Sequence, residues 1–199
     1  MQRPNIVVHS VTFHKVNVSV VQGDILLETS ECLLNTPNHD LVAAVGSTRT
    51  QQLYLSCGPT IALNKDMKKT KWQTGEVLVT KANPLLRRCG VKYVIHNCCS
   101  VYNTTQLQEL LKNTLETANQ LGVTSLSIPT PCSGAYGLSK EDATKHTLDA
   151  IVHLMYEKGQ VTPITSIRIC NADIGNTDAA AHLLDSLANS LIGKEMKRS

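Results

Sequence analysis

The sequence predicts an α/β protein with three layers, in which a mixed but mostly parallel central sheet lies between two layers of helices. Three observations carry this prediction. Short runs of β-branched and apolar residues recur along the chain, helical patterns separate the later runs, and 42% of the 199 residues are hydrophobic. A chain of this size and composition can build one well-packed core. We therefore expect a single domain over residues 1–192 and a disordered tail at residues 193–199.

Seven runs are expected to form strands, because β-branched and apolar residues dominate them. They are Asn5–Phe13, Val16–Val21, Cys32–Asn35, Glu76–Lys81, Lys92–Asn97, Val123–Ile128 and Thr165–Asn171. Only His14 and Lys15 separate the first two runs, which favours a β-hairpin there.

Apolar residues at helical spacing predict three helices among and after the later strands. The first pattern is Leu107, Leu110, Leu111, Leu115 and Ala118, the second is Ala143, Thr147, Ala150, Ile151 and Leu154, and a last helix covers about 177–191. Strands that alternate with such helices form a largely parallel sheet covered on both faces. Ligands of these sheets bind at the carboxyl ends of the strands.

Residues 123–151 combine a strand, a loop of small residues and a helix. The strand stops at Pro129, and the loop Cys132–Gly137 offers backbone N–H groups with few bulky side chains. Ser139 is placed as the N-cap of the helix, with Asp142 three residues later as a carboxylate variant of the capping box. Backbone donors beside a helix N-terminus suit an anion, above all phosphate.

Composition narrows the classes of partner that this protein is expected to bind. Charged residues make up 18% of the chain and the net charge is +3, which excludes a disordered polyelectrolyte and disfavours a nucleic-acid partner. We expect no membrane partner, since no apolar run could cross a bilayer and the N-terminus has no signal-peptide pattern. The seven cysteines are odd in number, and four of them (Cys32, Cys98, Cys99 and Cys170) lie in apolar runs. Free thiols in the cytoplasm or nucleus are therefore expected.

Several catalytic sites are disfavoured by the sequence. It has no GxxxxGK[ST] loop, and its histidines and cysteines form no HxxxH or CxxC, so neither a Walker-type nucleotide site nor a metal site is expected. Cys132 is the one thiol in a plausible nucleophile position, but it lacks a local His or Asp partner, and Leu138 stands where a cysteine phosphatase needs arginine. His96, in an apolar strand, is interpreted as a core histidine rather than a catalytic base.

Five motifs occur in an order that identifies a resemblance. They are Val21-Gln22-Gly23-Asp24-Ile25, Leu34–Asn38, Thr74–Thr80, Tyr93–His96 and Pro129–Gly137. Together they resemble the macrodomain family, whose members bind ADP-ribose. The resemblance implies a macrodomain-like fold, in which ADP-ribose is the ligand and no cofactor is needed. It also suggests that the chain is one macrodomain of a multidomain ADP-ribosyltransferase-type protein.

The resemblance also implies roles for individual residues. Asp24 would accept a hydrogen bond from the adenine amine, Asn38 would contact the distal ribose, and the loop at 133–136 would wrap the diphosphate. The implied ligand-binding set is Gly23, Asp24, Ile25, Asn38, Val45, Gly46, Ser47, Pro131, Cys132, Ser133, Gly134, Ala135, Tyr136, Gly137 and Asn171. Each motif also has a plain structural interpretation: a strand-ending turn for Gly-Asp, a turn or a helix cap for Asn38, and an ordinary strand-to-helix connection for the loop.

Departures from the family pattern bear on activity. The stretch His39–Thr48 has the single glycine Gly46 where catalytic relatives carry several, and Asn171 stands where many relatives place an aromatic that stacks on adenine. No catalytic residue is assigned, and Asn38 is the candidate. The leading hypothesis is a reader module that binds free or protein-linked ADP-ribose. The alternatives are a mono-ADP-ribosyl-protein hydrolase that uses Asn38 to position water, and a degenerate macrodomain that serves as a protein-interaction scaffold. The oligomeric state is left open.

Overall fold

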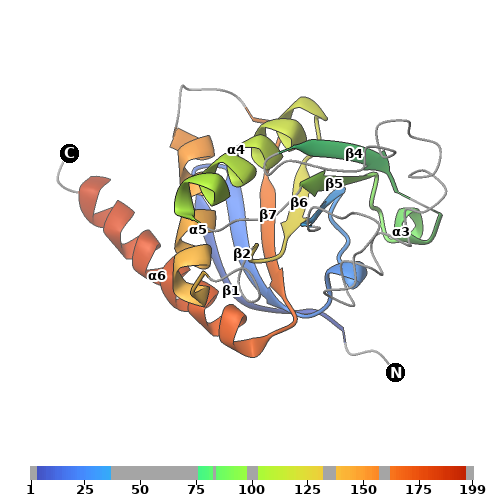
Figure 1. The fold of residues 1–199 in the computed structure, drawn as a ribbon. Coiled ribbons are helices and arrows are strands. Elements are labelled where there is room, and N and C mark those ends of the chain that lie inside the picture. Colours follow the sequence, from blue (N-terminus) through green and yellow to red (C-terminus); the bar gives the residue numbers. More distant parts are fainter. Residues whose placement is uncertain are drawn as a thin grey trace.

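A computed structural model describes residues 4–36, 76–82, 84–97, 103–131, 138–156 and 162–195. In these ranges the chain forms one seven-stranded sheet with helices packed on it (Figure 1). The strands are β1 (Ile6–Phe13), β2 (Val16–Gln22), β3 (Cys32–Asn35), β4 (Val77–Lys81), β5 (Tyr93–Asn97), β6 (Ser125–Ile128) and β7 (Ser166–Asn171). Every predicted strand is therefore present, with ends shifted by no more than two residues.

The order of the strands is β1-β2-β7-β6-β3-β5-β4. The five inner strands run parallel to one another, while β1 and β4 pair antiparallel at the two edges. The predicted mixed but mostly parallel sheet is thus confirmed. The β1–β2 hairpin is confirmed as well, and it turns at His14, whose φ of 50° lies in the left-handed region.

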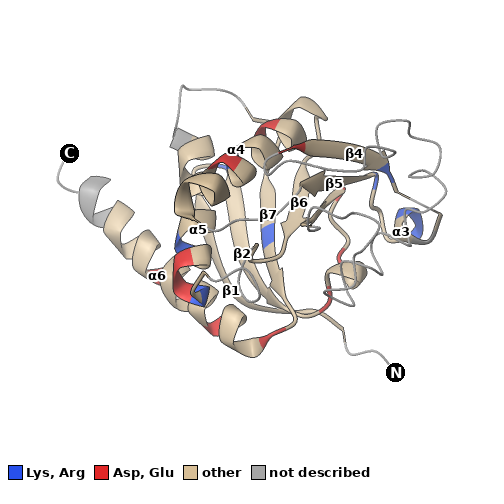
Figure 2. Ribbon diagram, viewed as in Figure 1, with Lys and Arg blue, Asp and Glu red and all other residues tan. Residues whose placement is uncertain are grey.

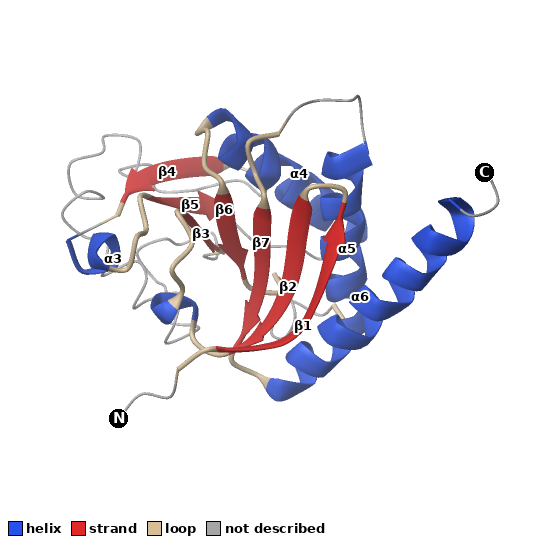
Figure 3. Ribbon diagram, turned by 180° about the vertical axis from the view of Figure 1, so that it is seen from behind, coloured by secondary structure: helices blue, strands red, loops and turns tan. Residues whose placement is uncertain are grey.

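Three long helices cover one face of the sheet (Figures 1 and 3). They are α4 (Thr104–Gln120), α5 (Lys140–Tyr156) and α6 (Ile174–Glu195). Their apolar sides meet inward-facing strand residues in the main core, which includes Leu34, Ile95, Leu126, Ile151 and Leu184. This layer follows directly from the apolar periods in the sequence, since residues three and four apart share one helix side.

The opposite face of the sheet carries a smaller described layer. Strand residues alternate between faces, so Leu33 and Val94 point away from the core that contains Leu34 and Ile95. They pack with residues from the short helix α3 (Pro84–Arg88) and with the 3₁₀ turn η1 (Ile25–Leu27). With a sheet between two helical layers, the predicted three-layer fold is confirmed. Neither α3 nor η1 is predicted from the sequence, because both are too short to show a helical period.

The C-terminal helix is longer than the sequence predicts. It begins at Ile174 and continues to Glu195, so the first three residues of the expected disordered tail are helical. Gly193 suggests a helix end, but one glycine costs a helix only about 1 kcal/mol, and no proline follows to stop it. Residues 196–199 lie outside the described ranges. Within those ranges, no helix has the length and apolar character that crossing a membrane requires.

Candidate functional site

The carboxyl ends of three neighbouring parallel strands bring the described part of the predicted site together. Strand β2 leads into Gly23-Asp24-Ile25, β7 ends at Asn171, and β6 leads into Pro129–Pro131. Gln22 is in register with Asn171, and the Gly23 N–H continues the ladder by donating to the Asn171 carbonyl at 2.9 Å. The turn after β2, the end of β7 and the start of the segment after β6 therefore lie at one edge of the sheet.

Ten of the predicted site residues lie outside the described ranges, and their roles stay predictions. They are Asn38, Val45, Gly46, Ser47, Cys132, Ser133, Gly134, Ala135, Tyr136 and Gly137.

Asp24 is held as the cap of a short turn. Its carboxylate accepts from the Leu26 N–H at 3.1 Å, and its carbonyl accepts from the Leu27 N–H at 2.9 Å, which starts η1 directly after the strand. The residue is buried, at 8% relative exposure. A carboxylate has acceptor capacity for several hydrogen bonds at once. Asp24 is thus a fixed acceptor at the sheet edge, as its proposed role toward an amine requires.

The Asn5 side chain forms hydrogen bonds with both backbone groups of Asp24. Its Oδ1 accepts from the Asp24 N–H at 2.7 Å, and its Nδ2 donates to the Asp24 carbonyl at 2.9 Å. The two residues are far apart in the chain, but the pairing of Ile6 with Gln22 brings Asn5 opposite the turn. No motif of the sequence singles out Asn5, so this residue is missed by sequence reasoning.

Gly23 is needed because of this contact. A Cβ atom added at Gly23 would lie 2.0 Å from Asn5 Oδ1, far inside van der Waals contact. The glycine of the Gly-Asp pair therefore makes room for the Asn5 amide.

A buried ion pair supports Asn5. Glu28, at 1% exposure, receives Arg168 through Nε at 2.5 Å and Nη2 at 3.1 Å, Ser127 through Oγ at 2.7 Å, and Asn5 through Nδ2 at 2.6 Å. Burial alone would raise the pKa of the Glu28 carboxyl, but the hydrogen bonds from Arg168, Ser127 and Asn5 and the charge of Arg168 outweigh it, so the pKa is lowered. Glu28 is consequently ionised at neutral pH. Each of the hydrogen bonds given above is donated to its carboxylate by a neighbouring side chain. No motif of the sequence points to Glu28 or Arg168.

Asn171 joins the end of β7 to the loop after β6. Its Oδ1 accepts from the Thr130 N–H at 2.9 Å, and its Nδ2 donates to Thr130 Oγ1 at 3.0 Å. The side chain is buried, at 5% exposure for the residue. Both ends of the amide are thus engaged in fixing the start of the loop that leads to the predicted phosphate cradle. Its expected position against the adenine ring stays a prediction.

The helix after this loop begins as predicted. The Asp142 N–H donates to Ser139 Oγ at 3.0 Å, and the Ser139 hydroxyl donates to the Asp142 carboxylate at 2.9 Å. The predicted N-cap Ser139 is thus confirmed, whereas the Asp142 carboxylate accepts from the Ser139 hydroxyl and not from its backbone N–H as in a full capping box.

Asp173, directly before α6, ties the two helix starts together. Its carboxylate receives Lys140 Nζ at 2.7 Å and the Asn176 N–H at 2.9 Å, and these two contacts lower the pKa of its carboxyl. The N-termini of α5 and α6 therefore lie side by side at the edge that carries the site.

His96 has the core role that the sequence favours. It is buried between Asn35, whose Nδ2 donates to Nδ1 at 3.1 Å, and Thr80, whose Oγ1 lies 2.9 Å from Nε2. Because an amide nitrogen can only donate, Nδ1 is the acceptor and Nε2 carries the proton. Burial lowers the pKa of the imidazole to about 4. His96 is therefore neutral at physiological pH and fully engaged with neighbouring strands.

The two buried cysteines of the described ranges are unsuited to nucleophilic chemistry. Cys32, Cys89 and Cys170 are free thiols, and burial raises the pKa of Cys32 to about 12 and that of Cys170 well above its usual range. In the described ranges no three His, Cys, Asp or Glu side chains gather as metal ligands would. Charges of both signs are interspersed over the described elements (Figure 2).

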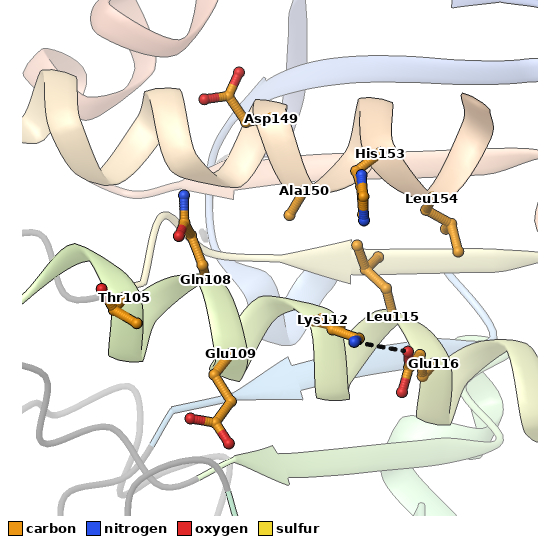
Figure 4. A pocket seen from close by; sticks show the side chains of 10 residues that line it. All are labelled: Thr105, Gln108, Glu109, Lys112, Leu115, Glu116, Asp149, Ala150, His153 and Leu154. Atoms are coloured by element: carbon orange, nitrogen blue, oxygen red, sulfur yellow. Dashed lines mark ion pairs between the residues drawn. The ribbon is translucent and has the colours of Figure 1, made fainter. Parts of the chain in front are cut away.

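A separate groove lies between α4 and α5, away from this edge (Figure 4). It encloses about 700 Å³, with Leu115 and Ala150 at its floor and the exposed Glu109, Asp149 and His153 along its rims. None of its lining residues belongs to the predicted site.

Comparison with known proteins identifies the fold. The chain is similar to an O-acetyl-ADP-ribose deacetylase of Pantoea vagans, with 25% identity over 177 residues that cover 84% of this chain and 98% of the relative. It is also similar to an ADP-ribose glycohydrolase of Archaeoglobus fulgidus, with 28% identity over 152 residues, 68% of this chain and 78% of the relative. Among solved structures, a single-residue variant of an Oceanobacillus iheyensis macrodomain with ADPR superposes at a TM-score of 0.77 and 20% identity, over 91% of this chain and 98% of the other.

A family model supplies the remaining evidence. The model of the Macro domain matches residues 35–147, which is more than half of the chain and overlaps the second, third, fourth and fifth motifs that suggested the resemblance. The chain belongs to the macrodomain family.

Proposed function

We propose that this protein binds ADP-ribose, free or attached to a protein, in a cleft at the carboxyl edge of its sheet, and acts as a reader of that modification. The observation that carries the proposal is the immobilised Asp24. Its backbone and its carboxylate are fixed, beside the end of β7 and the loop after β6, by hydrogen bonds to Asn5, Leu26 and Leu27. A fixed carboxylate suits an exocyclic amine, which is the group that adenine presents at this edge of its ring.

The macrodomain membership supports the same ligand. A structural neighbour is described with ADPR, and two relatives bear names of enzymes that act on ADP-ribose compounds. ADP-ribose would be the ligand of this cleft and not a resident cofactor. The free thiols of the described cysteines support a reducing compartment, and we propose the cytoplasm or nucleus as the location.

A thermal-shift series tests the binding function. ADP-ribose, ADP and AMP are compared at equal concentration, because a ligand that binds only the folded state raises the melting temperature. We expect the order ADP-ribose above ADP above AMP, and a loss of the shift by Asp24→Ala. The matched control is Asp185→Ala, an exposed aspartate of α6 that should keep the wild-type shift. If ADP-ribose raised the melting temperature of Asp24→Ala as much as that of the wild type, this carboxylate would not contribute to binding.

A hydrolase is the second candidate, and the names of the two relatives favour it. In this proposal Asn38 orients a water toward the bond between the distal ribose and an acidic side chain. The assay is release of ADP-ribose from a mono-ADP-ribosylated protein by the wild type and by Asn38→Ala. If neither the wild type nor Asn38→Ala releases ADP-ribose while both are folded, the reader function is favoured. Release by the wild type alone would establish catalysis.

A further inference from the structure

The network beneath the Gly23–Asp24 turn has more contacts than a strand-ending turn needs. Asn5 supplies both an acceptor and a donor to the backbone of this turn, and Glu28 and Arg168 lie behind it. Because Asp24 is buried, its backbone N–H and C=O need partners within the protein. Here one side chain fixes the N–H and the C=O of Asp24, the residue that we propose to recognise an amine.

The Asn5 amide can take only one orientation in this network. Its Nδ2 lies 2.6 Å from Glu28 Oε1, and a carboxylate accepts hydrogen bonds but cannot donate them. The amide oxygen must therefore face the Asp24 N–H. Glu28 itself is fixed by the fork of Arg168 and by the Ser127 hydroxyl. Side chains from three places therefore fix the turn: Asn5 before β1, Ser127 in β6 and Arg168 in β7.

The contact is also close-packed. Asn5 Oδ1 lies so near Gly23 that position 23 has no room for a side chain. Since Asp24 caps η1 through its own carboxylate, rotation of its backbone would break the bond to Leu26 and redirect the carboxylate. The direction of the Asp24 side chain is consequently coupled to the Asn5 amide.

We propose that Asn5 is a positioning residue for base recognition: by fixing the Asp24 backbone, it aims the Asp24 carboxylate so that the cleft selects a 6-amino purine over a 6-oxo purine. This inference rests on the proposed binding of ADP-ribose and deepens it. Asn5 itself need not touch the ligand. An amino group donates to the carboxylate, whereas a 6-oxo group presents a second acceptor to it, so selection depends on where the carboxylate points.

The test compares ADP with inosine diphosphate by calorimetry. The wild type is expected to bind ADP at least about tenfold more tightly, the usual effect of a lost hydrogen bond to a charged group. In Asn5→Ala this ratio should fall to about threefold or less. Asn5→Asp keeps the acceptor for the Asp24 N–H but loses the donor to the Asp24 carbonyl and places a second carboxylate against Glu28, so it should lose selectivity as well.

The control is Asn17→Ala, which removes an asparagine at the opposite end of β2, where its Nδ2 donates to Ser10 and Thr12. It should keep the wild-type ratio of the two affinities. A wild-type ratio in both folded Asn5 variants would overturn the inference, because a merely structural residue changes stability and leaves the choice of base alone.

Amide hydrogen exchange separates this inference from the proposed function, since it needs no ligand. The Asp24 N–H should exchange slowly in the wild type and at least about tenfold faster in Asn5→Ala, with β2 amides near Asn17 unchanged. Absence of ADP binding together with this exchange pattern would contradict the proposed function, while the hold of Asn5 on the Asp24 backbone would stand. Equal exchange at Asp24 in both proteins would contradict that hold and with it the positioning role of Asn5.

Discussion

Acidification is expected to destabilise this fold through His96. Burial between β3 and β4 lowers the pKa of the imidazole from 6.5 to about 4 in the folded state. Between these two pH values the unfolded chain binds a proton that the folded chain does not. The His96 contribution to the free energy of unfolding is therefore fully present above pH 6.5 and is lost as the pH falls toward 4. The contribution of His96 to this loss is about 2 kcal/mol at pH 5 and about 3 kcal/mol at pH 4.

The structure explains why the proton is excluded. Nδ1 already accepts from the Asn35 amide nitrogen, so a proton there would place two donors face to face. Urea unfolding of the wild type and of His96→Gln at several pH values between about 7.5 and 5 measures the effect. The wild type should lose about 2 kcal/mol more than the variant over this range, because glutamine does not titrate.

Two results would refute this reasoning. One is an equal dependence of the unfolding free energy on pH in the wild type and in His96→Gln. The other is an NMR titration of the folded protein in which the His96 ring protonates near 6.5, the value of an exposed imidazole.

Three further substitutions are predicted to destabilise the folded state, each measured by urea unfolding. Arg168→Met leaves the buried Glu28 carboxylate without its guanidinium and should cost about 3 kcal/mol at neutral pH. Since the folded pKa of Glu28 is lowered, that cost should shrink as the pH falls below 4.5, and a constant cost would argue against the ion pair. Asn171→Ala removes the acceptor of the Thr130 N–H and should cost about 1–3 kcal/mol; a neutral result would mean that water replaces it. Ile167→Ala opens a cavity in the fully buried core and should cost about 2–5 kcal/mol, and a smaller loss would indicate a core that collapses around the gap.

Local patterns in the sequence account for most of the described elements. The Ser139 N-cap needs only a partner three residues away, and the apolar period of α4 predicts its buried side directly. His96 is identified as a core residue because the two residues before it, Val94 and Ile95, are apolar and β-branched. Such features depend on near neighbours in the chain, and the structure confirms them.

Contacts between distant segments explain what sequence reasoning misses. Asn5 and Glu28 are 23 positions apart, and Arg168 is 140 positions from Glu28. In the sequence a glutamate and an arginine are expected at the surface, and nothing local shows that β2, β6 and β7 bring them together. Asn171 is placed correctly at the end of its strand, but its partner Thr130 lies 41 positions away, so the sequence does not reveal what its side chain contacts.

Calorimetric titration of the wild-type protein with ADP-ribose tests the central claim most directly. We predict saturable binding with one site per chain, weakened at least about tenfold by Asp24→Ala and unchanged by Asp185→Ala. No detectable heat at millimolar ADP-ribose from a folded protein, together with an unchanged melting temperature, would contradict the assignment of this cleft to ADP-ribose.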